Sequence, residues 1–125
     1  MFAISPGGTD ALYIAAGSVD IPLLPGIATA SVLMRGLEYG FKRFKFFPAE
    51  SSGGVAALRG FAGRFTQVKC CPTGGIDATK ASSCLALPNV ATVGGSWMAP
   101  NDALAAKDWA RIGTLAKTAA AVARG

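Results

Sequence analysis

The 125-residue chain contains no histidine. This absence excludes imidazole-based acid–base catalysis, the Ser–His and Cys–His nucleophile pairs, and metal sites that rely on histidine ligands. Covalent or acid–base chemistry in this protein must therefore use lysine, cysteine or carboxylate side chains. We predict no metal and no other cofactor.

Cysteine is scarce and poorly spaced for metal binding. The three residues are Cys70, Cys71 and Cys84, and no C-x-x-C pair occurs. An odd number of thiols without that spacing indicates neither a disulfide framework nor a zinc site. We predict a reduced, cytoplasmic protein in which the adjacent Cys70 and Cys71 act as small buried hydrophobic residues.

Charged residues make up only 15% of the chain, against 51% hydrophobic residues and 16 glycines. This composition excludes a disordered chain and a coiled coil, and it favours a globular protein with many turns. Residues 81–101 carry no charge and are numerous enough to span a membrane. Helix-breaking residues interrupt them at Pro88, Gly94, Gly95 and Pro100, so we predict no membrane span. The N-terminus also lacks the basic segment and cleavage site of a signal peptide.

Basic residues outnumber acidic ones, 12 against 7, which gives a net charge of +5. Such an excess suits nucleic acid, a membrane surface or an anionic small molecule. The basic residues are dispersed apart from one cluster at Lys42, Arg43 and Lys45, and no RNA-recognition pattern occurs. We therefore predict no nucleic-acid partner, and a small anionic substrate is compatible with the charge.

Short apolar, β-prone runs alternate with helical stretches along the chain. The runs cover residues 2–4, 21–24, 41–47, 68–71 and 90–93, and the helical stretches cover residues 9–16, 29–39, 54–62, 77–87 and 102–123. A strand followed by a helix about every 20 residues is typical of βαβ units with right-handed crossovers and parallel strands. We predict one α/β domain over residues 1–125, built from five βα units. The spacing alone suits a flavodoxin-like open sheet as well as part of a barrel.

The predicted helices have suitable residues at their ends. Threonine or aspartate at a helix start can accept a hydrogen bond from a first-turn amide, and glycine is favoured where a helix stops. The predicted N-caps are Thr9, Thr29, Asp77 and Asp102, and the predicted stops are Gly17, Gly40 and Gly63.

The third strand, residues 41–47, holds the strongest candidate for chemistry. Side chains alternate between the two faces of a strand, so Lys45 shares a face with Arg43 and Phe47, and the opposite face carries Phe44 and Phe46. Desolvation and a neighbouring cation both disfavour an ammonium, which would make the Lys45 amine nucleophilic and suited to imine chemistry. The pattern alone favours a structural Lys45 that extends to solvent or pairs with a carboxylate, because lysines in strands are usually not catalytic.

Two glycine-rich turns follow the last two predicted strands. They are Thr73-Gly74-Gly75 and Gly94-Gly95-Ser96. Glycine lets a backbone approach a ligand closely, and unpaired amides suit a phosphate. Neither a G-x-G-x-x-G nor a Walker A sequence occurs, so no motif supports nucleotide binding.

The remaining candidate functional residues are more simply explained by structural roles. Asp77 is placed as a helix cap, and Glu50 as a residue of the loop or first turn after the third strand. A stripe along the last helix consists of Ile112, Leu115, Ala119 and Val122, and it is typical of core or subunit contact.

Five of these segments together closely resemble one family. They are F-A-I-S-P-G at residues 2–7, P-L-L-P-G at 22–26, F-K-F-F-P-A-E at 44–50, C-P-T-G-G-I at 71–76 and G-G-S-W at 94–97. The chain resembles the 2-keto-3-deoxy-6-phosphogluconate (KDPG) aldolases, a class I family that includes 4-hydroxy-2-oxoglutarate (KHG) aldolases. The resemblance covers essentially the whole chain, and the F-K-F-F-P-A-E run is its most specific part.

The resemblance implies a role for each matching residue. Lys45 would form the Schiff base, Phe47 would line the pyruvate pocket, and Pro6 would lie at its rim. The turns would bind the carboxylate and phosphate ends of the substrate, through Thr73, Gly74 and Gly75 in one and Gly94, Gly95 and Ser96 in the other. The implied partners are pyruvate and a 2-keto-3-deoxy sugar-acid phosphate, with further copies of the chain in a trimer.

The resemblance also implies that part of the family's fold is absent. The family has a (β/α)8 TIM barrel, and F-A-I-S-P-G matches its fourth strand, so the chain corresponds to strands 4–8 without the first three βα units. Those units carry the family's proton-shuttling glutamate and a substrate-binding arginine, which nothing here matches. Met1 directly precedes the strand, as expected if translation or annotation began at an internal start.

The implied activity is cleavage of KDPG to pyruvate and glyceraldehyde 3-phosphate through an imine at Lys45. Without the glutamate we expect imine formation with severely reduced turnover. The alternative is an inactive barrel fragment that covers its open sheet edges with another copy or with a complementary fragment.

Overall fold

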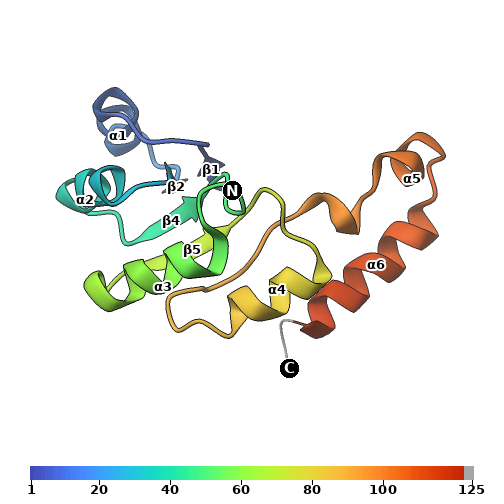
Figure 1. Ribbon diagram of the computed structural model, residues 1–125. Helices are drawn as coiled ribbons and strands as arrows, with labels where there is room; N and C mark the ends of the chain where they lie inside the picture. The colour runs from blue at the N-terminus through green and yellow to red at the C-terminus, as the bar shows by residue number, and fades with distance from the viewer. Residues whose placement is uncertain (123–125) are drawn as a thin grey trace.

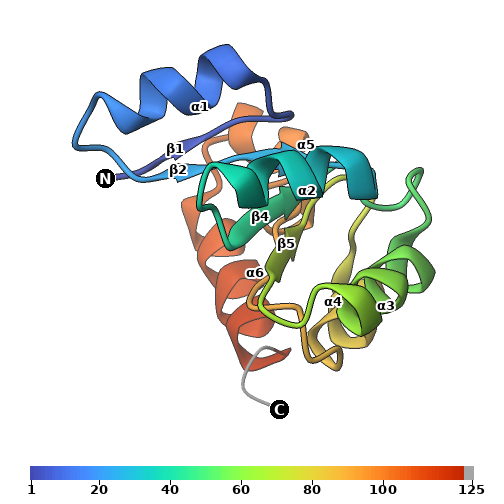
Figure 2. The same ribbon diagram turned by 90° about the vertical axis from the view of Figure 1, so that its left-hand side faces the viewer.

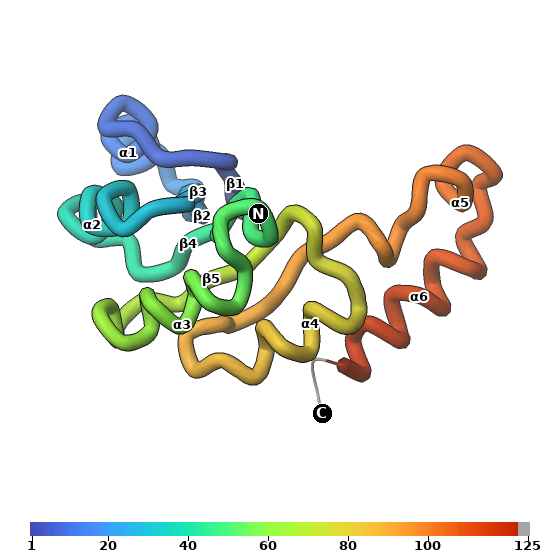
Figure 3. Tube along the Cα trace, in the orientation of Figure 1, coloured from blue at the N-terminus to red at the C-terminus, as the bar shows by residue number. Residues whose placement is uncertain are grey.

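Helices and short strands alternate throughout the computed structural model, which describes residues 1–122 (Figure 1). In chain order the elements are β1 (Ala3–Ile4), α1 (Asp10–Gly17), β2 (Leu23–Leu24), β3 (Gly26–Ile27), α2 (Ala30–Glu38), β4 (Arg43–Phe46), α3 (Gly54–Arg64), β5 (Lys69–Pro72), α4 (Ala78–Leu85), the 3₁₀ helix η1 (Ser96–Met98), α5 (Asn101–Ala105) and α6 (Trp109–Val122). The trace runs from α1 and α2 at one end, through the strands, to α5 and α6 at the other (Figure 3).

All paired strands are parallel, which confirms the predicted α/β class. β1 pairs with β2, and β3, β4 and β5 form a second sheet in that order. Of the second predicted strand, residues 21–24, only Leu23 and Leu24 form a strand, β2, and a further strand, β3, follows beyond the predicted end. Pro25, which has no amide to donate, separates the two. The Pro25 carbonyl still accepts a hydrogen bond from the Lys45 amide at 2.9 Å, so the two short strands follow one path beside β4.

The fifth predicted strand, residues 90–93, does not form a regular strand. The segment runs parallel to β5 and makes only isolated bridges, Cys70 with Val90 and Thr73 with Gly94. Hydrogen bonds from Cys70 N to Asn89 O (2.7 Å) and from Ala91 N to Cys70 O (3.0 Å) hold it there. The sequence predicts five βα units. The structure has four units with regular strands, and the fifth begins with an extended segment at the sheet edge.

Three of the four predicted N-caps are confirmed. The side chains of Thr9, Thr29 and Asp77 accept hydrogen bonds from first-turn amides at 3.3, 3.4 and 2.9 Å. Gly40 lies just beyond α2 with φ +85°, as expected for a helix stop. Gly17 is the last residue of α1, whereas Gly63 lies inside α3, so the prediction that Gly63 ends a helix was wrong.

The long C-terminal helix predicted from residue 102 is broken in two. Lys107 adopts φ 55° between α5 and α6, and the Asp108 side chain accepts a hydrogen bond from the Arg111 amide (3.0 Å) at the start of α6. Asp102 is not an N-cap: Pro100 precedes α5, and the Asp102 carboxylate pairs with Arg111 across the corner at 2.6 Å. The predicted last residue of this helix, residue 123, lies outside the described residues.

The core lies between the β3–β5 sheet and the helices α2, α3 and α4. Phe44 and Phe46 of β4 are fully buried together with Leu33 of α2 and Leu58 of α3. The views in Figures 1 and 2 agree that α3 and α4 run side by side along this sheet. Arg43 and Lys45 alternate with the buried phenylalanines and are more exposed, so helices cover only one face of β4.

The C-terminal helix packs against α4 and η1 through the predicted stripe. Ile112, Leu115, Ala119 and Val122 are the half-buried positions of α6, and Val122 contacts the main core. Within residues 1–122, no helix is both long enough and apolar enough to cross a membrane.

Candidate active site

Lys45 lies near the carboxyl end of β4, on the face that the helices leave open. It is half-buried and stands in register with Gly26 on one side and Cys71 on the other. The Lys45 ammonium lies 4.4 Å from the centre of the Phe47 ring, within the range of a cation–π interaction. The predicted sharing of a face by Lys45 and Phe47 is thus what the structure shows.

The other members of the basic cluster lie toward the opposite end of the strands. Lys42 and Arg43 line an open groove of about 890 Å³ together with Lys69, Phe41 and Phe2. Lys45 does not line this groove, so it lies apart from its basic sequence neighbours.

Pro6 and Phe47, far apart in sequence, line one cavity of about 430 Å³. The S-P-G turn after β1 supplies Pro6, and the loop after β4 supplies Phe47. Close packing fixes the turn, since a Cβ on Gly26 would overlap the Pro6 carbonyl group. The structure thus brings together two of the residues predicted to contact pyruvate.

The Thr73-Gly74-Gly75 turn follows β5 directly and has a conformation that requires glycine. Gly74 and Gly75 have φ angles of +94° and +76°. The turn is fixed to the loop after β4 by hydrogen bonds from Ala49 N to Thr73 O (2.8 Å) and from Glu50 N to Gly74 O (3.1 Å). A Cβ on Gly74 would lie 3.2 Å from the Phe47 ring, so this turn and Phe47 are in contact.

Two donor groups of this turn have no partner within the described part of the chain. The Gly75 amide donates to no acceptor among residues 1–122, and the buried Thr73 hydroxyl is without a hydrogen-bond partner there. The bridge that pairs Thr73 with Gly94 directs the Gly74 amide toward the Gly94 carbonyl. Backbone amides in a turn can bind an anion, so the Gly75 amide and the Thr73 hydroxyl can receive a carboxylate.

The Gly94-Gly95-Ser96 turn lies against the first turn. A Cβ on Gly94 would approach the Thr73 methyl to 2.8 Å, and the Gly94 amide donates to the Pro72 carbonyl at 3.0 Å. Gly95 is covered by the Trp97 ring and precedes η1. Two glycine turns thus meet at the carboxyl end of β5, where their backbones can approach a ligand.

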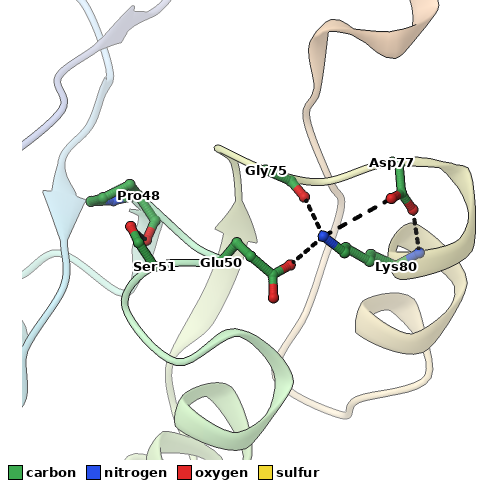
Figure 4. Close-up of polar contacts among 6 residues, drawn as sticks. All are labelled: Pro48, Glu50, Ser51, Gly75, Asp77 and Lys80. Carbon is green, nitrogen blue, oxygen red and sulfur yellow. Dashed lines mark hydrogen bonds and ion pairs between the residues drawn. The ribbon is translucent and has the colours of Figure 1, made fainter.

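Glu50, Asp77 and Lys80 form a charged cluster beside the Thr73-Gly74-Gly75 turn (Figure 4). The Lys80 ammonium lies 2.9 Å from the Glu50 carboxylate and 4.0 Å from Asp77, and it donates to the Gly75 carbonyl at 3.1 Å. The hydrogen bond to Glu50 raises the pKa of Lys80. Glu50 is a loop residue and Asp77 a helix cap, as predicted, but sequence reasoning missed Lys80 because its partner Glu50 is distant in the chain.

The three cysteines differ in burial. Burial raises the pKa of the Cys70 thiol to about 12, and Cys84 is also buried with a raised pKa. Burial also raises the pKa of the half-buried Cys71, although Lys45 opposes that shift. Cys70 thus confirms the prediction of a buried hydrophobic thiol, and Cys71 satisfies it only in part.

We expect the native protein to react slowly with a thiol reagent near neutral pH, because the thiolate is the reactive form and raised pKa values keep it scarce. Cys71 should be labelled first, since its side chain is the most accessible of the three. Mass spectrometry after timed labelling in native and denaturing buffer would show this order. Rapid native labelling of Cys70 would contradict the burial seen here.

A half-buried lysine lies on a parallel strand, with an aromatic ring beside it and two glycine turns at the same strand ends. This arrangement defines the class of site: a lysine suited to imine formation on an α/β scaffold. Residues 1–115 match the family model described as "Aldolase: KDPG and KHG aldolase". The chain belongs to this family of carbon–carbon lyases.

Individual relatives agree with the family match. The chain is 54% identical over its whole length to 2-dehydro-3-deoxy-phosphogluconate aldolase of Pseudoalteromonas atlantica, covering 58% of that protein. It is 56% identical over 94% of its length to the KHG/KDPG aldolase of Escherichia coli K12, covering 55% of that protein. The chain thus spans little more than half the length of these relatives.

The chain is also similar to a solved structure from Legionella pneumophila. That structure is of a KDPG aldolase with pyruvate captured at low pH as a covalent carbinolamine intermediate. The two share 51% identity with a TM-score of 0.89, over 91% of this chain and 55% of that one.

Proposed function

We propose that this chain carries the imine-forming site of a class I aldolase acting on 2-keto-3-deoxy-6-phosphogluconate, with Lys45 as the nucleophile. The observation that carries the proposal is the position of Lys45, half-buried beside Phe47 and next to two glycine turns. The carbinolamine captured in the Legionella relative, 51% identical to this chain, supports the same covalent chemistry.

In the proposed reaction the free Lys45 amine attacks the C2 ketone of the substrate and gives a carbinolamine, which loses water to form an imine. The protonated imine draws electrons from the C3–C4 bond as the C4 hydroxyl loses its proton. Glyceraldehyde 3-phosphate leaves, the remaining enamine takes a proton at C3, and water releases pyruvate and restores the amine.

The surrounding groups suit the two ends of this substrate. We assign the pyruvate portion to Pro6, Phe47 and the Thr73-Gly74-Gly75 turn, whose Gly75 amide and buried Thr73 hydroxyl have no partner within residues 1–122. The phosphate is assigned to Gly94, Gly95 and Ser96, where glycine permits close backbone approach. A net charge of +5 favours an anionic substrate in general terms.

We further propose that the chain is a single domain, residues 1–125, matching strands 4–8 of a (β/α)8 barrel that assembles as a trimer. The parallel course of β1, the β2–β3 path, β4, β5 and the bridged segment 90–93 supports this correspondence, as does the coverage of about half of each relative. None of the 125 residues matches the glutamate that the resemblance places on the first three units. General acid–base catalysis contributes about 10²–10⁴-fold, so these 125 residues by themselves should cleave the substrate more slowly by about that factor, while imine formation persists.

The alternative is an inactive fragment that associates with a second copy or a complementary fragment. Ile4 on the edge strand β1 is 54% exposed, and Phe2, just before that strand, is 61% exposed. This exposure is the observation that favours association. Association and imine formation are compatible, so only the chemistry distinguishes an active site from an inactive one.

Borohydride trapping tests the proposal. The protein is incubated with pyruvate and reduced with borohydride, and its intact mass is measured by mass spectrometry. Protein treated with borohydride without pyruvate is the control. We expect one reduced pyruvate per chain, together with slow pyruvate release from the sugar-acid phosphate. A protein that is folded by circular dichroism yet gains no pyruvate would favour the inactive fragment.

A further inference from the structure

Lys80 makes three polar contacts that join separate segments around the Thr73-Gly74-Gly75 turn (Figure 4). Its ammonium meets Glu50 from the loop after β4, the Gly75 carbonyl from the turn after β5, and Asp77 at the start of α4. We propose that Lys80 is a positioning residue of the pyruvate site, which neutralises Glu50 and holds the turn in the orientation that receives the pyruvate carboxylate. This inference rests on the proposed function, because it concerns the same site.

Glu50 is held close to this turn whether or not Lys80 is present. Its amide donates to the Gly74 carbonyl at 3.1 Å, and a Cβ on Gly75 would lie 2.6 Å from the Glu50 Cβ. Backbone contacts thus keep Glu50 beside the turn, and its side chain starts from that position. Without Lys80, an unneutralised negative charge would remain beside amides that are assigned to bind another carboxylate.

The Lys80 cation itself is well placed by its helix. The Asp77 side chain caps α4 by accepting a hydrogen bond from the Lys80 amide at 2.9 Å, which fixes the backbone from which the ammonium extends. The Lys80 and Glu50 side chains remain 44% and 50% exposed. An ion pair of that exposure contributes little to folding, so removing it should change ligand binding more than stability.

The expected effect follows from the repulsion between two like charges at the same turn, partly screened by solvent. We expect Lys80→Met to raise the pyruvate concentration that gives half-maximal trapping by about three- to tenfold. The trapped yield at saturating pyruvate should not change, because Lys45 is untouched. Lys80→Arg keeps the charge and should remain within about twofold of the unmodified protein.

A double substitution tests whether Lys80 acts through Glu50. Glu50→Gln removes the charge that Lys80 neutralises, so Lys80→Met combined with Glu50→Gln should restore half-maximal trapping to about its original concentration. Lys117→Met removes a cation from the exposed surface of α6 and is the matched control. Thermal unfolding of every variant checks that differences in trapping do not arise from unfolding.

The proposal is supported if Lys80→Met weakens pyruvate binding, the double variant restores it, and Lys117→Met has no effect. It is overturned if Lys80→Met titrates like the unmodified protein, or if the double variant binds as weakly as Lys80→Met alone. If the unmodified protein itself traps no pyruvate, the proposed function fails and this inference falls with it.

Discussion

Replacing Lys45 with alanine is expected to abolish the pyruvate adduct, reducing it to the level of the borohydride control. The substitution removes the amine that must attack the ketone, and no other lysine lies beside Phe47 in the described residues. The fold should survive, because the Lys45 side chain is half-buried on the open face of β4 and supports no part of the core. Intact mass spectrometry after trapping measures the result.

Two further lysine variants serve as controls for Lys45→Ala. Lys45→Arg keeps a cation near the Phe47 ring but lacks a nucleophilic amine, so it should also give no adduct. Lys42→Ala removes a lysine that lines the groove at the other end of the strands, and it should trap pyruvate normally. An adduct on Lys45→Ala equal to that of the unmodified protein would assign the nucleophile elsewhere.

Replacing Phe46 with alanine is expected to lower the free energy of unfolding by about 3–5 kcal/mol, the usual cost of removing a buried phenylalanine. Phe46 is fully buried, and its ring meets Phe61 of α3 edge-on with ring centres 5.8 Å apart. Domains of this size have only about 5–15 kcal/mol of stability, so the variant should lie near the limit of folding. Chemical denaturation followed by circular dichroism gives the difference.

Replacing an exposed phenylalanine with alanine provides the control for Phe46→Ala. Phe2 is 61% exposed, and Phe2→Ala should change the free energy of unfolding by about 0.5 kcal/mol or less. Equal losses for the two variants would contradict the burial of Phe46 in the core.

Alternation along β4 made much of the site predictable from sequence. A strand has two faces, so burying Phe44 and Phe46 leaves Lys45 and Phe47 together on the other face. Helix starts at Thr9, Thr29 and Asp77 were predictable because a cap involves residues only three apart. Both patterns are local, and tertiary packing did not override them.

Features that depend on distant partners were not predictable. Residues 90–93 have strand-like composition but lie at the sheet edge with only isolated bridges to β5. The break between α5 and α6 occurs at Lys107, a residue that rarely adopts a positive φ. Lys80 was missed for a similar reason: no sequence pattern joins it to Glu50, and only the packing of α4 beside the loop after β4 brings them together.

The identity of the reacting lysine is settled by peptide mapping of the trapped protein. After reduction with pyruvate present, proteolysis and tandem mass spectrometry locate the modified side chain among the lysines of the chain. The structure predicts the adduct on Lys45 alone. An adduct on Lys42 or Lys69, both of which line the groove at the other end of the strands, or no adduct in a folded sample, would contradict the assignment of this site.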